Sequence, residues 1–305
     1  MLHGVPSPRP RLHPLDAAAQ AWMLATSHRM PATDVPWLDG PSADARIVGH
    51  GWVQRQAREI RGRVSRGPDH GLLPSFAELS GPGFDPADVD PRIVDFYEHT
   101  SRWRMDLWSE WAPLAWPFGR AIAALWSVRL QQLSLPMHPL DVSFGMNSEV
   151  VHIHDSRDCV VGSGWLRTMR KTGATTYSGQ YGTATLAGTG QPSVRVVFPL
   201  PLGSLAVFLT PSADADGGLH LRSPIGKFGS DGAYLVLHRR GGMLNVRRIP
   251  VAEHFHLYVD RDGYVRTDHA LRLWNIPAVR LHYRLTRMVD DEIPAAVPAA
   301  AASCL

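Results

Sequence analysis

This 305-residue chain contains two pairs of histidines whose spacing would suit metal binding or catalysis. His152 and His154 lie two positions apart in VVHIHD, and His254 and His256 lie two apart in EHFHLYVD. Alternate side chains of a β-strand project from the same face, so each pair could offer two imidazole ligands to an ion such as zinc. A metal-dependent enzyme that uses the His-x-His pairs is therefore one hypothesis for the chain.

The surroundings of the two pairs favour a simpler interpretation. The residue between the histidines is apolar in both, Ile153 in the first pair and Phe255 in the second. This alternation predicts half-buried strands whose wetter faces carry the histidines. No cysteine or glutamate completes a familiar ligand spacing beside either pair. We therefore expect two solvated strand faces, no bound metal and no cofactor.

His269 is placed differently, because alternation in YVRTDHALRLW puts it on the same face as Leu271, the apolar face. One interpretation is a core histidine that bonds a backbone carbonyl or an acid. The other is a polar group inside a ligand cavity, which could act as an acid or base near neutral pH. The further candidates for inward-facing contacts with a ligand are Trp165, Tyr177 and Tyr181.

The secondary structure predicted to position these residues changes from helices to strands near residue 142. From there the hydrophobic period is two and the connections are short, which predicts antiparallel strands joined by tight turns such as Gly241-Gly242. So many strands in sequence imply a meander that forms a barrel or a sandwich to protect its edges, and a lipocalin-like architecture fits. The predicted strands are SEVVHIH, CVVGSGWLRT, ATTYSGQYG, VRVVFPL, SLAVFLT, GLHLRS, AYLVLHR, MLNVRRI, HFHLYVD, YVRTDHALRLW and VRLHYRL.

The part of the chain before residue 142 reads as helical. Asp90 followed by Pro91 is typical of a helix start, and a further helix is expected over 118–133. Five of the ten tryptophans lie between 103 and 126, where a role in the core is expected. The fold class is thus α+β, with N-terminal helices packed on a long antiparallel sheet. The expected organisation is a disordered stretch at 1–14, a helical part with the Trp-rich segment at 15–140, an antiparallel β domain at 141–286 and a disordered tail at 287–305.

Composition narrows the functional classes. The net charge is only +3, so no nucleic-acid partner is expected. No apolar run has the roughly 20 residues that span a bilayer, and no strongly basic amphipathic helix accompanies the tryptophans. We expect neither a transmembrane segment nor peripheral membrane contact. The two cysteines, Cys159 and Cys304, suit a reducing cytoplasm.

Several sequence segments occur in the same order as in a known protein family, which the chain therefore resembles. They are FYEHTSRWRMDLWSEW, LQQLSLPMHPLDVS, GWLRTMRKTGATTYSGQYG, VVFPLPLGSLAVFL, LYVDRDGYVRTDHALRLW and LHYRL. Their order resembles the soluble C-terminal domain of the YndJ-like bacterial proteins, over roughly residues 90–285. YndJ-like proteins also carry a membrane-spanning part, for which this sequence shows no segment. The resemblance implies a bacterial protein and assigns no catalytic residue.

The leading functional hypothesis is binding of an apolar small molecule, lipid- or polyketide-like, in a cavity of the sheet. Sheets of this strand number often enclose such a ligand. An isomerase or cyclase that acts in the same cavity, with His269 and a tyrosine hydroxyl, is an alternative. The metal-dependent enzyme and a structural or interaction module without a pocket are further alternatives. The sequence leaves open whether the protein is an enzyme.

Overall fold

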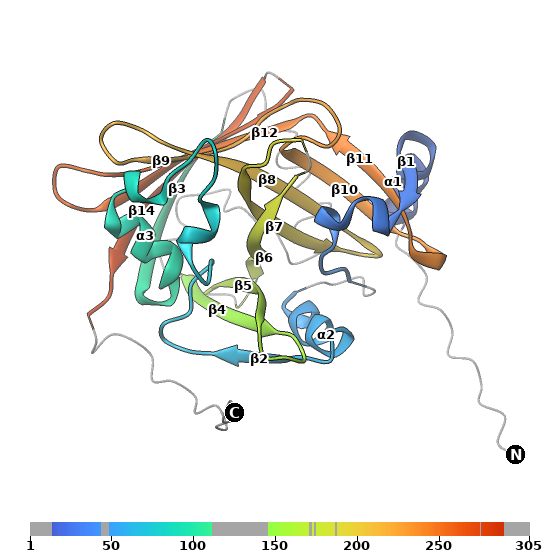
Figure 1. Cartoon of the computed structure of the whole chain (residues 1–305), viewed down its shortest axis with the longest axis horizontal. Coiled ribbons are helices and arrows are strands. Elements are labelled where there is room, and N and C mark those ends of the chain that lie inside the picture. Colours follow the sequence, from blue (N-terminus) through green and yellow to red (C-terminus); the bar gives the residue numbers. More distant parts are fainter. Residues whose placement is uncertain are drawn as a thin grey trace, which may run out of the picture.

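The computed structural model describes residues 14–43, 49–111, 146–170, 173, 175–186, 188–274 and 276–289. In this part of the chain, fourteen strands form one antiparallel sheet, accompanied by three α-helices (Figure 1). The helices are α1 (Pro14–Thr26), α2 (Gly51–Glu59) and α3 (Pro91–Glu98). The helix expected over 118–133 and nearly all of the two ends expected to be disordered lie outside the described residues.

The eleven strands predicted after residue 142 are confirmed. The predicted turn at Gly241-Gly242 also forms, with φ of 72° and 68°, a region that glycine enters without steric cost. The strands are β4 (Met146–His154), β5 (Val160–Met169), β6 (Thr175–Thr185), β7 (Pro192–Leu200), β8 (Gly203–Ala213), β9 (Leu219–Ser223), β10 (Gly232–His238), β11 (Met243–Ile249), β12 (Val251–Val259), β13 (Val265–Leu273) and β14 (Ile276–Arg287).

Three more strands lie in the segment expected to be helical. They are β1 (His28–Pro31), β2 (Arg63–Arg66) and β3 (Trp103–Trp111), which pair with β11, β4 and β14. In β3, Trp103 and Leu107 are buried whereas Arg104 and Trp108 are exposed, so this strand also has a period of two. The alternation was missed because the exposed face carries a tryptophan as well.

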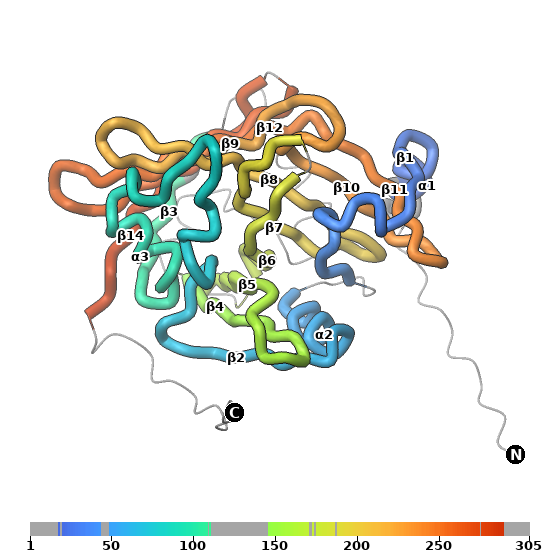
Figure 2. The backbone as a smooth tube through the Cα atoms, viewed as in Figure 1, coloured from blue at the N-terminus to red at the C-terminus, as the bar shows by residue number. Residues whose placement is uncertain are grey.

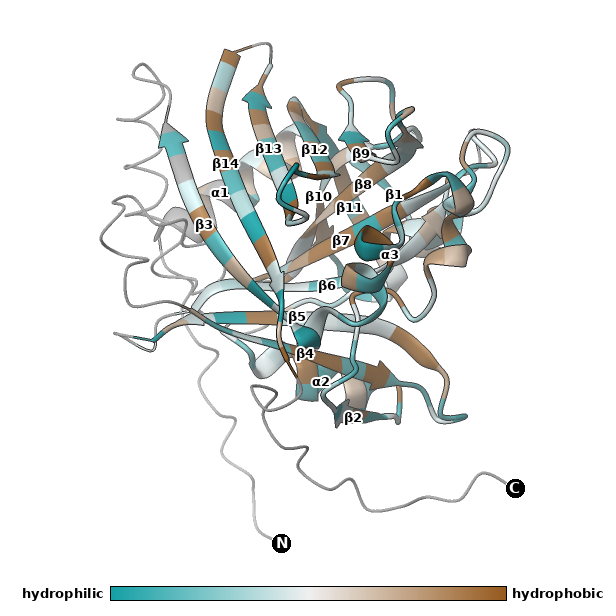
Figure 3. Cartoon of the chain, turned by 90° about the vertical axis from the view of Figure 1, so that its left-hand side faces the viewer, coloured by the Kyte–Doolittle hydropathy of each residue, from teal (hydrophilic) through white to brown (hydrophobic). Residues whose placement is uncertain are grey.

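The sheet is open, and the expected barrel is not formed by the described residues. Neighbouring strands follow the order β2-β4-β5-β6-β7-β8-β9-β12-β13-β14-β3. The sheet branches at β8, where Gly203–Phe208 pairs with β10 and Thr210–Ala213 pairs with β9. Strands β10, β11 and β1 form the side branch, on the right in Figure 2. Seen from the side, β3, β14, β13, β12 and β9 stand in a row above β4, β5 and β6, which cross below them (Figure 3).

Helices cover different parts of this curled sheet. The start of α3 was predicted correctly, because Asp90 Oδ1 accepts a hydrogen bond of 2.9 Å from the backbone N–H of Arg92 and Pro91 is the first helical residue. Phe96 of α3 is buried in the main hydrophobic core. Helix α2 instead packs Trp52 against the opposite face of β4 and β5, in a smaller cluster. Among the described residues, no helix is long and apolar enough to cross a membrane.

Candidate ligand cavity and histidine clusters

A cavity of about 260 Å³ lies at the centre of the main core. Its walls are the inner faces of β3, β5–β8 and β12–β14, together with part of α3, and most of its lining is apolar. The four residues that the sequence predicts as ligand contacts all line this one cavity. Trp165 and the two tyrosines reach it from the β5–β6 side, and His269 reaches it from β13.

Aromatic rings form one wall of the cavity. The ring centroid of Trp165 lies 5.4 Å from that of Tyr177 and 5.7 Å from that of Tyr181, both in edge-to-face orientation. The indole N–H of Trp165 donates to Ser148 Oγ at 2.8 Å, so its polar atom is satisfied. The hydroxyls of Tyr177 and Tyr181 hydrogen-bond each other at 2.8 Å. Burial raises the pKa of both phenols well above its ordinary value, so both stay neutral donors.

Arg167 brings a positive charge into the cavity. The residue is 5% exposed, and its guanidinium carbon lies 5.3 Å from the Trp165 ring centroid. The Nη2 group approaches Met146 Sδ at 3.6 Å, and none of the described residues hydrogen-bonds the buried Nε. No carboxylate among the described residues pairs with it. Burial lowers the pKa of Arg167, and the neighbouring tyrosines partly offset this shift. An arginine nevertheless stays charged in a protein, so the cavity contains a cation for which the described part of the chain supplies no counter-ion.

An acid–base pair lies on the opposite side of the cavity. His269 Nε2 and Glu253 Oε2 are 3.0 Å apart, and both side chains are nearly buried. The imidazole stacks on Phe255, its partner on β12, at 3.7 Å between ring centroids. His269 Nδ1 is buried and has no hydrogen-bond partner in the described part of the chain. Both interpretations of His269 thus apply together, because it bonds an acid and also borders a cavity.

The His269–Glu253 pair interacts electrostatically with the tyrosines of the cavity. The charge of Glu253 contributes to raising the pKa of Tyr177, Tyr181 and Tyr283, so these hydroxyls lie within electrostatic range of the carboxylate. The arrangement provides a cation for an anionic group, neutral hydroxyl donors, and an imidazole that could accept or donate a proton.

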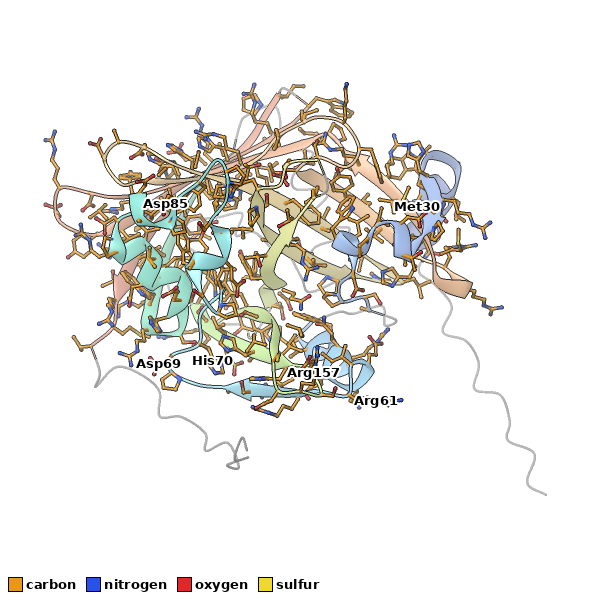
Figure 4. All side chains as sticks on the ribbon, viewed as in Figure 1. Met30, Arg61, Asp69, His70, Asp85 and Arg157 are labelled. Carbon is orange, nitrogen blue, oxygen red and sulfur yellow. The ribbon has the colours of Figure 1, made fainter. Side chains whose placement is uncertain are left out.

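The first histidine pair is covered, which corrects the expectation of a solvated strand face. His154 is buried and both ring nitrogens are engaged, since Nε2 lies 2.8 Å from Ser65 Oγ and Nδ1 lies 3.1 Å from the Asp158 carbonyl. His152 Nε2 bonds the Gly71 carbonyl at 3.0 Å, and its ring stacks on His70 at 3.9 Å. Figure 4 labels His70, in the segment after β2. Burial and the neighbouring histidine lower the pKa of His152 to about 4.

The second pair lies on the outer face of β12, as expected, and other ionisable side chains lie beside it. His256 pairs across the strands with His220 of β9, and the two rings stack at 4.1 Å. His254 Nε2 lies 3.0 Å from His220 Nδ1, and His256 Nε2 lies 3.1 Å from Asp214 Oδ2. Burial and the adjacent histidines lower the pKa of His220 to about 4. The two His-x-His pairs therefore belong to separate clusters.

Several residues of both sites were missed by the sequence analysis. Arg167 shares a strand face with Trp165, and Glu253 shares one with Phe255, so a charged residue on an apolar strand face was the available signal. His220 had none, because its approach to His256 depends on which strands are neighbours.

Comparisons with known proteins give no assignment. No protein-family model matches the chain, and neither a curated protein nor a solved structure is similar to it. The resemblance to the YndJ-like proteins stays a prediction from the sequence.

Proposed function

We propose that this protein binds a small, largely apolar molecule with an anionic group, held in the cavity of the sheet. The observation that carries the proposal is Arg167, a buried guanidinium with no counter-ion among the described residues, on the wall of an apolar cavity. An unpaired buried charge costs several kcal/mol. A carboxylate, sulfonate or phosphate on the ligand would supply the missing partner, and arginine binds such groups in bidentate fashion.

The cavity limits the size of the ligand. An engineered cavity of about 150 Å³ holds one benzene molecule. At about 260 Å³, the cavity here would take a single substituted ring or a short acyl chain. Trp165 and Tyr177 offer edge-to-face contacts to a ring, and Phe255 continues the apolar wall. The lipid- or polyketide-like ligand of the sequence hypothesis is thus narrowed to a small acidic member of those classes.

Titration calorimetry with matched probes tests the proposal. The probes are 4-alkylbenzoates, from methyl to hexyl, and the corresponding neutral benzamides. We expect at least one benzoate to bind the wild-type chain, and to bind at least tenfold more tightly than its amide. Arg167→Met should remove this preference, whereas Arg170→Gln, which changes the exposed arginine directly after the same strand, should retain it.

Two outcomes would contradict the proposal. The first is that no probe binds and that native mass spectrometry of protein purified from its own host shows no bound molecule. The second is that the preference for the carboxylate survives in Arg167→Met. Binding of benzoate and amide with equal affinity would leave a cavity protein but remove the role of Arg167.

An isomerase or cyclase in the same cavity is the second candidate, and the unpaired Nδ1 of His269 favours it. With Nε2 bonded to Glu253, this nitrogen is free to exchange a proton with a ligand. The test incubates the molecule recovered from the host with protein in D₂O. Deuterium should enter a C–H bond of that molecule with the wild type and not with His269→Gln. No incorporation with the wild type would leave a binding protein.

A further inference from the structure

We infer that Asp214, His220 and His256 form a binding site for a divalent transition-metal ion on the outer face of the sheet. One nitrogen from each histidine and one carboxylate oxygen all lie within 4.8 Å of one another. The site is independent of the cavity, because His256 projects from the opposite face of β12 to the cavity residues Glu253 and Phe255.

The spacing of the ligand atoms fits a metal. Asp214 Oδ2 lies 3.1 Å from His256 Nε2 and 3.5 Å from His220 Nε2. Ligands at about 2.0–2.2 Å from a tetrahedral zinc ion are themselves about 3.4 Å apart. The two imidazole rings stack at an interplanar angle of 17°, and the Nε2 atoms of both rings lie beside the same oxygen, Asp214 Oδ2.

Asp214 is held ready for this role by the turn between β8 and β9. Its Oδ1 accepts backbone hydrogen bonds from Asp216 at 3.0 Å and from Gly218 at 2.8 Å. These bonds fix the carboxylate and leave Oδ2 facing the histidines. A ligand whose second oxygen is held by the protein loses little conformational freedom when it binds an ion.

His254 is a hydrogen-bond partner for the ring nitrogen of His220 that points away from Asp214. Its Nε2 lies 3.0 Å from His220 Nδ1. When His220 Nδ1 carries the proton and donates it to His254, the lone pair of His220 Nε2 is free and faces Asp214. Metal-bound histidines characteristically donate their other ring N–H in this manner. The cluster therefore supplies both the ligands and a partner that orients one of them.

The surrounding charges allow a cation to bind. Asp268 is the cross-strand neighbour of His256 on β13 and adds a second carboxylate to this face. Arg222 is the nearby positive group, and its Nη1 donates to Ser212 Oγ at 2.7 Å. The three ligand side chains are 17–31% exposed, so solvent can reach the ion and complete its coordination. Two imidazoles and a carboxylate suit zinc, cobalt or nickel rather than calcium or magnesium.

The experiment titrates the metal-free, full-length chain with Co²⁺ and Zn²⁺, followed by visible absorption and by calorimetry. We expect one ion per chain, with the cobalt bands of nitrogen and oxygen ligands. His220→Gln and His256→Gln should each weaken binding at least about 100-fold, and His254→Gln should weaken it about 10–100-fold. The matched control is His282→Gln, an outer-face histidine on β14 that bonds Asp268 and should leave the affinity unchanged.

Several results would overturn the inference. They are the absence of stoichiometric binding, equal affinity in His220→Gln and His256→Gln, or loss of binding in the control variant. Thermal melts in a chelator show whether each variant is folded. If either histidine variant fails to fold, Asp214→Asn replaces it, because asparagine can keep the turn through its side-chain oxygen while removing the charged ligand. Unchanged binding in a folded Asp214→Asn would also overturn the inference.

Discussion

Replacing Arg167 by methionine should stabilise the protein while removing the anion site. Arg167 is 5% exposed; within the described residues its buried Nε has no hydrogen-bond partner and its Nη2 contacts the sulfur of Met146 at 3.6 Å. Methionine is two atoms shorter but similar in volume, it is apolar, and it leaves no strong hydrogen-bond partner without its donor, since the Met146 sulfur is a weak acceptor. The substitution therefore removes a desolvated charge without opening a large cavity.

The magnitude follows from two opposing contributions. The desolvation penalty of an unpaired buried cation is several kcal/mol. The contact with the Trp165 ring, at 5.3 Å, opposes it, and a cation–π interaction contributes about 0.5–2 kcal/mol. A net gain of about 1–3 kcal/mol in the free energy of unfolding is expected. At about 2–3 °C per kcal/mol for a chain of this size, the melting temperature should rise by about 2–9 °C.

Urea unfolding followed by circular dichroism measures this change. Arg170→Met is the control, because Arg170 is exposed, and its effect should stay within about 0.5 kcal/mol. A loss of more than about 1 kcal/mol in Arg167→Met would refute the reasoning, since protein groups would then be stabilising the guanidinium in the folded chain. If Arg167→Met is more stable and no longer binds benzoate, the charge of Arg167 serves ligand binding and lowers the free energy of unfolding.

Two further substitutions test the histidines. His269→Leu should lower the free energy of unfolding by about 1–3 kcal/mol, because it leaves the nearly buried Glu253 carboxylate without its partner; equal stability by urea unfolding would mean that water already hydrogen-bonds Glu253. Because the pKa of His152 is lowered from 6.5 to about 4, the unfolded chain takes up the proton first and stability should fall as the pH drops through that window. The loss should be about 2 kcal/mol after allowance for partial exposure, and it should be smaller in His152→Gln, whose amide can still donate to the Gly71 carbonyl; equal pH slopes would contradict the assignment.

The sheet and the inward-facing residues could be predicted from the sequence because alternation is a local property. In β13, Leu271 and His269 lie on one face, and this was enough to point His269 inward. Trp165 and Tyr177, which were also predicted to face inward, line the same cavity. Turn residues marked the ends of the strands, so all the strands after residue 142 were found.

The neighbours of each strand could not be predicted, and both histidine clusters depend on them. Strand β12 pairs with β9 rather than with β11, because β10 and β11 leave the main sheet at the branch on β8. Only this non-sequential pairing brings His220 beside His256. The partial burial of His152 likewise comes from a segment about eighty residues away in the sequence, which carries His70 and Gly71. Alternation gives the face of a residue but not what covers that face.

Strand β12 ties the two proposed sites together. Glu253 and Phe255 face the cavity, whereas His254 and His256 face the outer cluster, so neighbouring residues of one strand serve both. A register slip of one residue would turn the histidines inward and expose the acid and the apolar ring. Pairing with β9 on one side and β13 on the other holds that register, and the buried Leu257 reinforces it. An ion held between Asp214 on the turn after β8 and His256 on β12 would add a further restraint, so metal binding should stabilise the wall of the cavity that carries Glu253.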